Sequence, residues 1–445
     1  MMQPVEASVV SFESSLRKGL GRSMLLLRQE PDNSELNAVL LRACTEDQRY
    51  DRACETGRVP YLHQLILATG QVGQYRSALR SRLQALASAE AVGDAVAAAH
   101  ITKKRRDLEL IFGLLCRLAA HDGRLQAILR EFVLTAEDRE LGSSCAPELV
   151  RLEGISALLA CAHRFSPEIR ELPPYITNMA DALAARDGLS SATAALQQAR
   201  RADVALNALF CLDEDEAAEQ EAAPLPTYDV LKAEMERGGA KGPSFRWFPY
   251  AWIMGASQVE IDRAATDLIA ETDKAKIKAY LGIFRRRAFP GDPTVLFPLL
   301  GSADRRIEFD AANVLGRISH PAIRDLAFRL IAEQRPAVGA RVLRSSRQEG
   351  DLATLTEVLN ELIGDEDTYH GVGLSVLDML KHSADGSGEA RQILLHIYEN
   401  GPCSGCRGYA VDLLAKAGCI PEWMVKEGRY DAEPSIAERF RLLAT

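Results

Sequence analysis

The feature that most constrains the fold is a pair of helices that recurs through the C-terminal half of the chain. Candidate pairs begin near six positions, about 28 to 36 residues apart: Gln258, Asp292, His320, Gly350, Gly386 and Ile420. Asp292-Pro293 and His320-Pro321 each place a proline in the first turn of a helix, where its missing N–H costs nothing. Since one pair cannot bury its own apolar face, the recurrence predicts a stack of neighbouring pairs.

Small and branched apolar residues mark the second helix of each pair. They are Ala311, Ala312 and Leu315; Ala340 and Leu343; Leu374, Leu377 and Leu380; and Ala410, Leu413 and Leu414. The segments DRRIEFDAANVLGRI (304–318), RGYAVDLLAKAG (407–418) and DAEPSIAERFRLL (431–443) resemble HEAT repeats in their Asp, Arg and Ala-x-x-x-Leu register. The resemblance covers about 190 residues, with repeats shorter than the usual ~40–47, so an armadillo-like or atypical stack stays open. It implies a curved binding surface and no particular chemistry.

Composition agrees with an all-α fold. The apolar side chains are mainly Ala and Leu, which are strong helix formers, and aromatic residues make up only 6% of the chain. Few stretches alternate β-branched and aromatic residues at period two, so a sizeable sheet is not expected. We therefore predict a helical domain followed by an α-α superhelical, HEAT/ARM-like solenoid.

The domain organisation follows from shifts in composition along the 445 residues. Residues 1–10 form a loose tail, and 11–212 form a helical domain without the repeat register, which we leave unassigned. The acidic, proline-containing and aromatic stretch 213–257 is a linker with a bridging helix around Leu231. Residues 258–445 form the repeats.

Charge and hydropathy exclude several protein classes. A net charge of −9 argues against a protein that coats nucleic acid indiscriminately. The sequence contains no run of about 18 uncharged apolar residues, so we expect no membrane span. The N-terminus lacks a signal-peptide core, so we expect a cytoplasmic protein whose nine cysteines are reduced and mostly buried.

Cys403-x-x-Cys406 is the only close cysteine pair. A zinc site requires four ligands, and the second pair is missing, although Cys419, His396 and His382 are near in sequence. A redox-sensitive thiol at a helix start is another interpretation. We favour simple packing, and expect no metal and no cofactor.

A second cluster of reactive side chains lies in YDRACETGRVPYL (50–62). Cys54 and the following His63 suggest a nucleophile and its base, but Pro60 separates them and no orienting acid can be placed. We favour a helix junction held by Asp, Glu and Arg pairs. The sequence contains no phosphate-binding, nucleophile-elbow, zinc-protease or dinucleotide motif. Whether the protein is an enzyme stays open, and a non-enzymatic role is favoured.

Aromatic residues gather just before the repeats, in 245–252. Arg246, Trp247 and Trp252 could stack on bases or hold a partner peptide. The alternative, which we favour, is a hydrophobic plug that seals the N-terminal end of the stack.

The middle of the repeats is basic. Residues 278–347 contain thirteen basic and six acidic residues, whereas 348–445 contain eight basic and seventeen acidic ones. Arg341, Arg344 and Arg347 are three apart and can share a helix face wherever one helix contains all three. The candidate binding residues are Arg285, Arg286, Arg287, Arg305, Arg306, Arg341, Arg344 and Arg347, with Arg246, Trp247 and Trp252. Alternatively, these arginines are salt-bridge partners within the stack.

The leading hypothesis is a non-enzymatic scaffold or adaptor that binds a protein partner on the concave repeat surface. The alternative is a nucleic-acid-binding or DNA-acting helical-repeat protein that uses the arginine-rich stripe. DNA glycosylases built on HEAT-like repeats form a known family, but none of their functional residues can be matched here. A thiol-dependent enzyme using Cys54 or Cys406 is the third hypothesis.

Overall fold

Helices are the only regular secondary structure in the described part of the chain. The computed structural model describes residues 8–88, 96–166, 169, 174–210, 226–237, 248–381 and 387–443. These residues contain no β-strand, which confirms the all-α prediction. Within the same ranges, no helix combines the length and the apolar character needed to cross a membrane.

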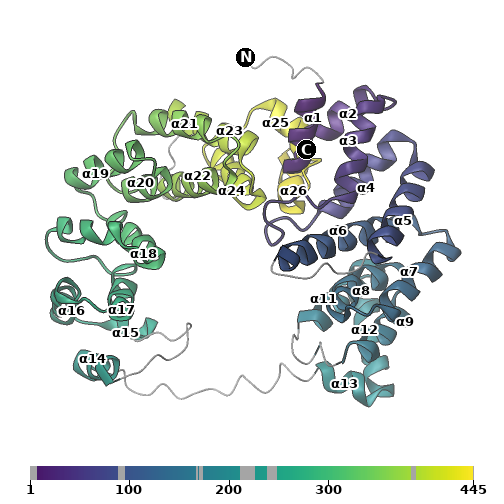
Figure 1. Ribbon diagram of the computed structural model, residues 1–445, viewed down its shortest axis with the longest axis horizontal. Coiled ribbons are helices and arrows are strands. Elements are labelled where there is room, and N and C mark those ends of the chain that lie inside the picture. The colour runs from purple at the N-terminus through teal and green to yellow at the C-terminus, as the bar shows by residue number, and fades with distance from the viewer. Residues whose placement is uncertain are drawn as a thin grey trace. The chain divides into compact units, whose positions relative to one another are not determined.

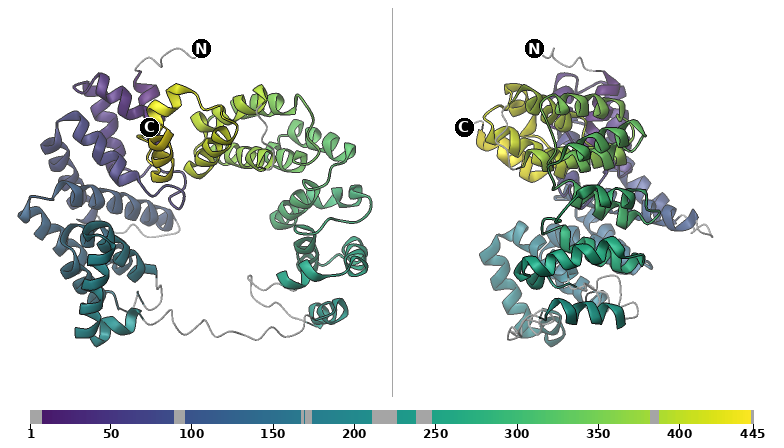
Figure 2. Two further views of the ribbon diagram at one scale, coloured as in Figure 1. Left: turned by 180° about the vertical axis from the view of Figure 1, so that it is seen from behind. Right: turned by 90° about the vertical axis from the view of Figure 1, so that its left-hand side faces the viewer.

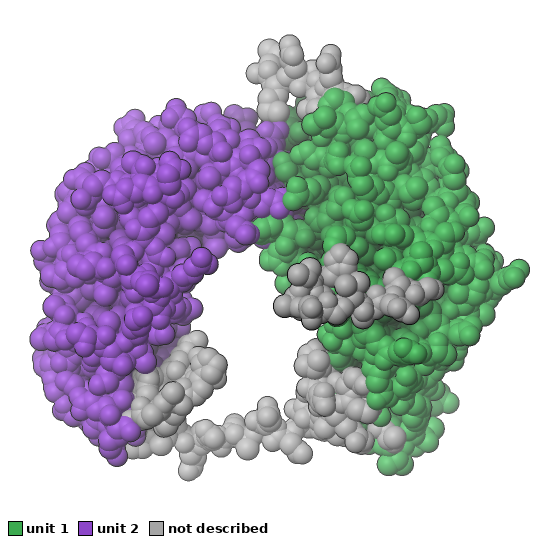
Figure 3. Space-filling model, viewed as in Figure 1, with its two compact units in different colours: residues 1–220, 422–445 green, residues 221–421 purple. Residues whose placement is uncertain are grey.

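The chain divides into two compact units, coloured separately in Figure 3. Unit 1 comprises residues 1–220 and 422–445, and unit 2 comprises residues 221–421. Most of the sequence predicted as a linker, 213–225 and 238–247, lies outside the described residues. Helix α14 (Tyr228–Arg237) stands where a helix was predicted around Leu231.

Unit 1 is built from helices of both chain ends, as Figure 1 labels them. They are α1 (Val9–Lys18), α2 (Arg22–Gln29), α3 (Ser34–Thr45), α4 (Arg58–Thr69), α5 (Val72–Ser88), α6 (Val96–Leu118), α7 (Gly123–Thr135), α8 (Arg139–Glu153), α9 (Ile155–Arg164), α11 (Pro174–Asp187), α12 (Leu189–Ala202), α13 (Val204–Phe210), α25 (Glu422–Gly428) and α26 (Pro434–Leu443).

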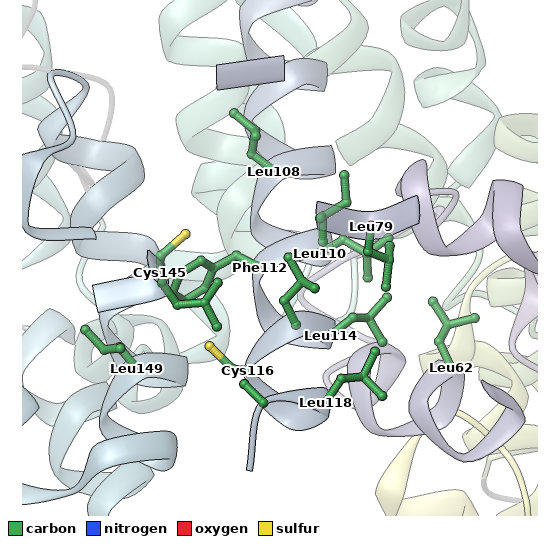
Figure 4. Close-up of a cluster of buried hydrophobic side chains, with 14 of the residues drawn as sticks. Leu62, Leu79, Leu108, Leu110, Phe112, Leu114, Cys116, Leu118, Cys145 and Leu149 are labelled. Carbon is green, nitrogen blue, oxygen red and sulfur yellow. The ribbon is translucent and has the colours of Figure 1, made fainter. Parts of the chain in front are cut away.

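The core of unit 1 is centred on α6. Leu110 and Leu114 point to one side of this helix and Phe112 points to the other, as Figure 4 shows, and all three are almost completely buried. Helix α6 packs against α3, α4, α5, α7 and α8. Residues 107–118, the second half of α6, are buried except for the half-buried Glu109 and Arg117, so the unit assembles around this part of the helix.

Helices α25 and α26 belong to unit 1, so the prediction that residues 258–445 form one repeat domain is wrong at this end. Helix α25 contacts α2, and the Ala432 N–H donates to the Gly19 carbonyl at 2.8 Å. Gly21 is required here, because a Cβ atom at this position would lie 1.8 Å from the Glu427 carbonyl oxygen. Periodicity shows that such a helix has a face to bury, but it does not identify the surface that covers that face.

Unit 2 contains helices that follow one another in chain order through the teal-to-yellow part of Figures 1 and 2. They are α14, α15 (Tyr250–Gly255), α16 (Gln258–Ala270), α17 (Lys274–Phe284), the 3-10 helix η1 (Pro293–Gly301), α18 (Arg305–Leu315), α19 (Pro321–Ala332), α20 (Pro336–Leu343), α21 (Asp351–Glu361), α22 (Glu366–Leu380), α23 (Gly388–Asn400) and α24 (Ser404–Lys416).

Neighbouring helices of unit 2 pack as pairs: α16 with α17, η1 with α18, α19 with α20, α21 with α22, and α23 with α24. The second helices of these pairs, α17, α18, α20, α22 and α24, contact one another in succession. Their small apolar residues are buried as predicted, except Leu374, which is 40% exposed.

Local signals explain where the pairs begin. Ser257 and Glu260 form a reciprocal capping box at the start of α16. Asp292 caps η1, and the His320 side chain accepts from the Ala322 N–H at the start of α19. Both of the last two helices have proline at their first position, as their sequences predicted.

Candidate functional site

Two of the arginines predicted to bind a partner converge on one buried carboxylate. Asp310 on α18 is 2% exposed. Arg306, one turn earlier on α18, donates through Nε to Asp310 Oδ2 at 2.7 Å. Arg285, the residue that follows α17, places Nη1 3.2 Å from Asp310 Oδ1. These two cations therefore balance a buried charge and join neighbouring second helices.

Arg344 likewise links three second helices. It is the residue that follows α20, and it donates to the carbonyls of Gly316 and Asn313 at the end of α18, both at 3.2 Å. Its Nη1 lies 3.3 Å from Asp378 Oδ2 on α22. A cation that meets the last carbonyls of a helix stabilises them and also complements the helix dipole.

A common helix face of Arg341, Arg344 and Arg347 does not form. Helix α20 ends at Leu343, so only Arg341 lies within it. Arg347 lies half-buried in the following turn. The turn redirects the chain towards the next pair, and a spacing of three residues places side chains together only while the helix continues.

The arginines after α17 interact with the segment that precedes α16. Arg287 Nη1 donates to the carbonyls of Ile253 and Ala256, both at 3.0 Å. The Arg286 guanidinium lies 5.3 Å from the centre of the Tyr250 ring. Arg287 is thus occupied by main-chain acceptors, while Arg286 stacks on an exposed aromatic ring.

The predicted aromatic group is only partly described. Arg246 and Trp247 lie outside the described residues. Trp252 is 3% exposed and packs beside Phe248 and Tyr228, with ring centres 5.2 and 6.0 Å away. In this position Trp252 is a core residue of unit 2 and is not accessible to a base or a peptide.

Arg341, one of the predicted binding residues, is half-buried and lies against an exposed aromatic ring. The Arg341 guanidinium on α20 lies 4.4 Å from the centre of the Phe309 ring on α18, and Phe309 remains 38% exposed. Arg306 approaches the same ring at 5.8 Å, and Arg305 is exposed in the first turn of α18. Burial lowers the pKa of Arg341, and the nearby charge of Arg344 lowers it further. Among the described residues, no carboxylate forms a salt bridge with Arg341.

A pocket of about 510 Å³ opens near the C-terminal ends of α18, α20 and α22. It is lined by Arg317, Arg344, Ser345, Asp378, Met379 and Lys381. The basic side chains of this pocket lie next to helix C-termini, where the carbonyl ends of the helix dipoles favour positive charge.

A second kind of site lies at the start of α24. Cys403 is the N-cap of this helix, and Cys406 follows in its first turn. His370 on α22 places Nδ1 3.4 Å from the Cys406 sulfur. The two sulfurs and one ring nitrogen of His370 all lie within 4.8 Å of one another. Three soft donors from adjacent second helices thus converge on one point.

The Cys403 thiol differs from the cysteines of the unit 1 core. A hydrogen bond from Cys406 is the main cause that lowers the pKa of Cys403 to about 4; burial opposes the shift and His370 adds to it. By contrast, burial raises the pKa of Cys116 and Cys145 well above the usual value. Those core cysteines behave as the small buried hydrophobes that the sequence predicted.

His370 is the residue that sequence reasoning missed. His396 and His382 are nearer to Cys403 in the chain and were the histidines expected beside it. His396 instead stacks on Tyr369, with ring centres 5.9 Å apart, and His382 lies outside the described residues. The usable signal was the repeat itself, because equivalent second helices lie side by side and bring residues one repeat apart together.

The reactive-looking segment before α4 is held by charged pairs, in agreement with the interpretation favoured from sequence. Arg58 and Glu55 form a buried two-point pair, and Arg58 also donates to the Leu16 carbonyl at 2.6 Å. Burial lowers the pKa of His63, and the charge of Arg117 lowers it further. The tight interaction in this segment is therefore an ion pair that closes a helix junction.

Comparisons with known proteins give no assignment. No protein-family model matches the chain, and neither the curated proteins nor the solved structures contain a match.

Proposed function

We propose that this protein is a non-enzymatic, HEAT-like scaffold that binds a protein partner on the surface formed by the second helices of unit 2. The ordered pairing of helices, and the succession of contacts between second helices, support a repeat stack. Repeat arrays of this kind commonly present a continuous surface to a partner. A fold of this kind serves many functions, and the surface residues determine which partner it binds.

The observation that carries the proposal is the stack of Arg341 on Phe309. Arginine and aromatic side chains are enriched among the residues that dominate binding energy at interfaces. Phe309 is 38% exposed although it is held against two guanidinium groups, so its apolar ring is presented to solvent in a fixed orientation. Side chains already ordered before binding lose less conformational entropy when a partner docks.

The partner chemistry follows from the charge of this surface. Arg341 is half-buried and forms no salt bridge among the described residues, which favours a partner carboxylate that would pair with its guanidinium. The exposed edge of Phe309 favours an apolar side chain next to that carboxylate. We infer that the partner segment carries Asp or Glu close to a large apolar residue.

The nucleic-acid alternative receives less support from the same contacts. Arg285, Arg306 and Arg344 are paired with carboxylates of unit 2, and Arg287 is bound to carbonyl groups. Arginines engaged in this way are less available to neutralise phosphates. If nucleic acid were the ligand, binding to oligonucleotides should survive ~150 mM salt and weaken when Arg341 is replaced.

A peptide selection tests the proposal directly. The full chain is immobilised and a random peptide library is selected on it, after which dissociation constants of synthetic copies are measured by fluorescence anisotropy. We expect the selected peptides to combine an acidic and a large apolar residue. Arg341→Ala should weaken their binding roughly 10-fold or more, as for a central interface residue.

The matched control is Arg391→Ala, which removes an exposed arginine on α23 and should leave affinity unchanged. Selected peptides without acidic residues, or equal effects of the two substitutions, would contradict the proposed surface. A circular dichroism melt of each variant distinguishes lost binding from lost structure.

A further inference from the structure

The cluster at the start of α24 has the donor chemistry of a metal site. Cys403 and Cys406 offer two sulfurs, and His370 offers one imidazole nitrogen, all within 4.8 Å of one another. Thiolate and imidazole are the preferred ligands of zinc, whereas magnesium and calcium prefer oxygen. Two thiolates also balance the charge of one divalent ion.

The distance between Cys406 and His370 suits two ligands of one ion, and the Cys403 sulfur lies within 4.8 Å of both donors. Zinc–sulfur and zinc–nitrogen bonds of about 2.3 and 2.0 Å at tetrahedral angles separate neighbouring donors by roughly 3.5 to 3.8 Å. Cys406 Sγ and His370 Nδ1 are 3.4 Å apart, so a small outward movement of either side chain would admit the ion between them.

The backbone presents both sulfurs from one turn of chain. Cys403 is the N-cap of α24 in an extended conformation, and Cys406 is the third residue of the helix. Both sulfurs therefore come from a four-residue stretch of chain and lie within 4.8 Å of each other. His370 completes the set from α22, which packs directly against α24.

We propose that His370, Cys403 and Cys406 together bind one zinc ion. Three protein donors leave the fourth tetrahedral position for water or another ligand, the arrangement of open zinc sites. The ion would join the last two helix pairs of unit 2. This site is independent of the Phe309–Arg341 surface and does not require the scaffold proposal to be correct.

The first test uses cobalt as a spectroscopic substitute for zinc on the intact, reduced protein. Co²⁺ bound by two thiolates in a tetrahedral site gives an intense sulfur-to-metal absorption band and visible ligand-field bands, which zinc added afterwards should abolish. We expect saturation at one Co²⁺ per chain. Absence of the sulfur-to-metal band in the wild-type protein would overturn the proposal without any variant.

Variants then identify the ligands. Cys406→Ser and His370→Ala should each weaken zinc binding by at least about 100-fold, because loss of even a supporting partner of a ligand costs 10- to 100-fold. Cys419→Ser is the matched control, since its half-buried sulfur donates to the Leu414 carbonyl. Zinc binding that survives Cys406→Ser, or a Cys403–Cys406 disulfide in place of metal under reducing conditions, would refute the zinc site.

Discussion

Arg22 and Glu427, 405 positions apart in the chain, form a two-point ion pair inside unit 1. Arg22 Nε donates to Glu427 Oε2 at 2.7 Å, and Nη2 donates to Oε1 at 3.2 Å. The Glu427 side chain is only 4% exposed, so its charge depends on this partner. The pair attaches α25 to α2, so a C-terminal helix packs in the same unit as the N-terminal helices.

Removing the carboxylate of this pair should destabilise unit 1. We expect Glu427→Ala to lower the free energy of unfolding by about 3 kcal/mol, because Arg22 would be left largely buried without its partner. Urea denaturation followed by circular dichroism measures the change. Glu438→Ala is the control, because its pair with Arg441 is about 60% exposed and should contribute less than about 0.5 kcal/mol. Equal effects of both substitutions would contradict the prediction.

Gly21 should not tolerate even a methyl group. Its φ of −62° suits any residue, but a Cβ would lie 1.8 Å from the Glu427 carbonyl oxygen. Gly21→Ala should therefore cost about 3 kcal/mol as α25 is pushed from α2. Gly73→Ala on α5 is the matched change with open space around it, and should be stabilising by about 0.5–1 kcal/mol. Thermal melts of the two variants should shift in opposite directions.

Replacing Asp310 should lower the free energy of unfolding more than replacing Arg285 or Arg306, the two arginines that pair with it. Asp310→Ala removes the acceptor shared by Arg285 and Arg306, and we expect a loss of about 2 kcal/mol from the unfolding free energy. Arg306→Ala should cost under about 1 kcal/mol, because that side chain is 57% exposed and Arg285 still balances the carboxylate. Chemical denaturation measures both variants. A larger loss for Arg306→Ala than for Asp310→Ala would show that Asp310 is not the residue on which these contacts depend.

Asp47 gives unit 1 a pH-dependent contribution to stability. Burial raises the pKa of Asp47, but hydrogen bonds and charge from Arg49 outweigh burial and hold the pKa below its ordinary value of 3.8. A carboxyl with a lower pKa in the folded state stabilises the fold above the unfolded-state pKa and loses that contribution as the pH falls through the folded-state pKa.

We expect the wild type to have a higher free energy of unfolding than Asp47→Asn, by a difference that is constant from pH 7 to about pH 5. Below about pH 4 this difference should shrink, because protonation makes the wild-type carboxyl neutral, as the amide of Asn is at every pH. Urea denaturation across this range measures both proteins under the same conditions. A difference that widens on acidification would mean that the Asp47 pKa is raised.

Local signals explain why the helices could be predicted. Ser257 with Glu260, and Asp292 or His320 before proline, specify where α16, η1 and α19 begin. These signals act through hydrogen bonds within four residues, so the sequence states them without reference to the rest of the chain. The spacing of Arg341 and Arg347 also allowed a shared helix face, but α20 ends at Leu343 and the face does not form.

The sequence by itself determined the helical class, the starts of the helix pairs and the apolar faces that had to be buried. Only the tertiary structure decided that residues 422–445 pack in unit 1, that Arg341 meets Phe309, and that His370 meets Cys403 and Cys406. Helix formation depends on neighbours along the chain, whereas each of these meetings depends on which surfaces of distant helices fit together. Many pairings satisfy the same apolar periodicity, and packing selects among them.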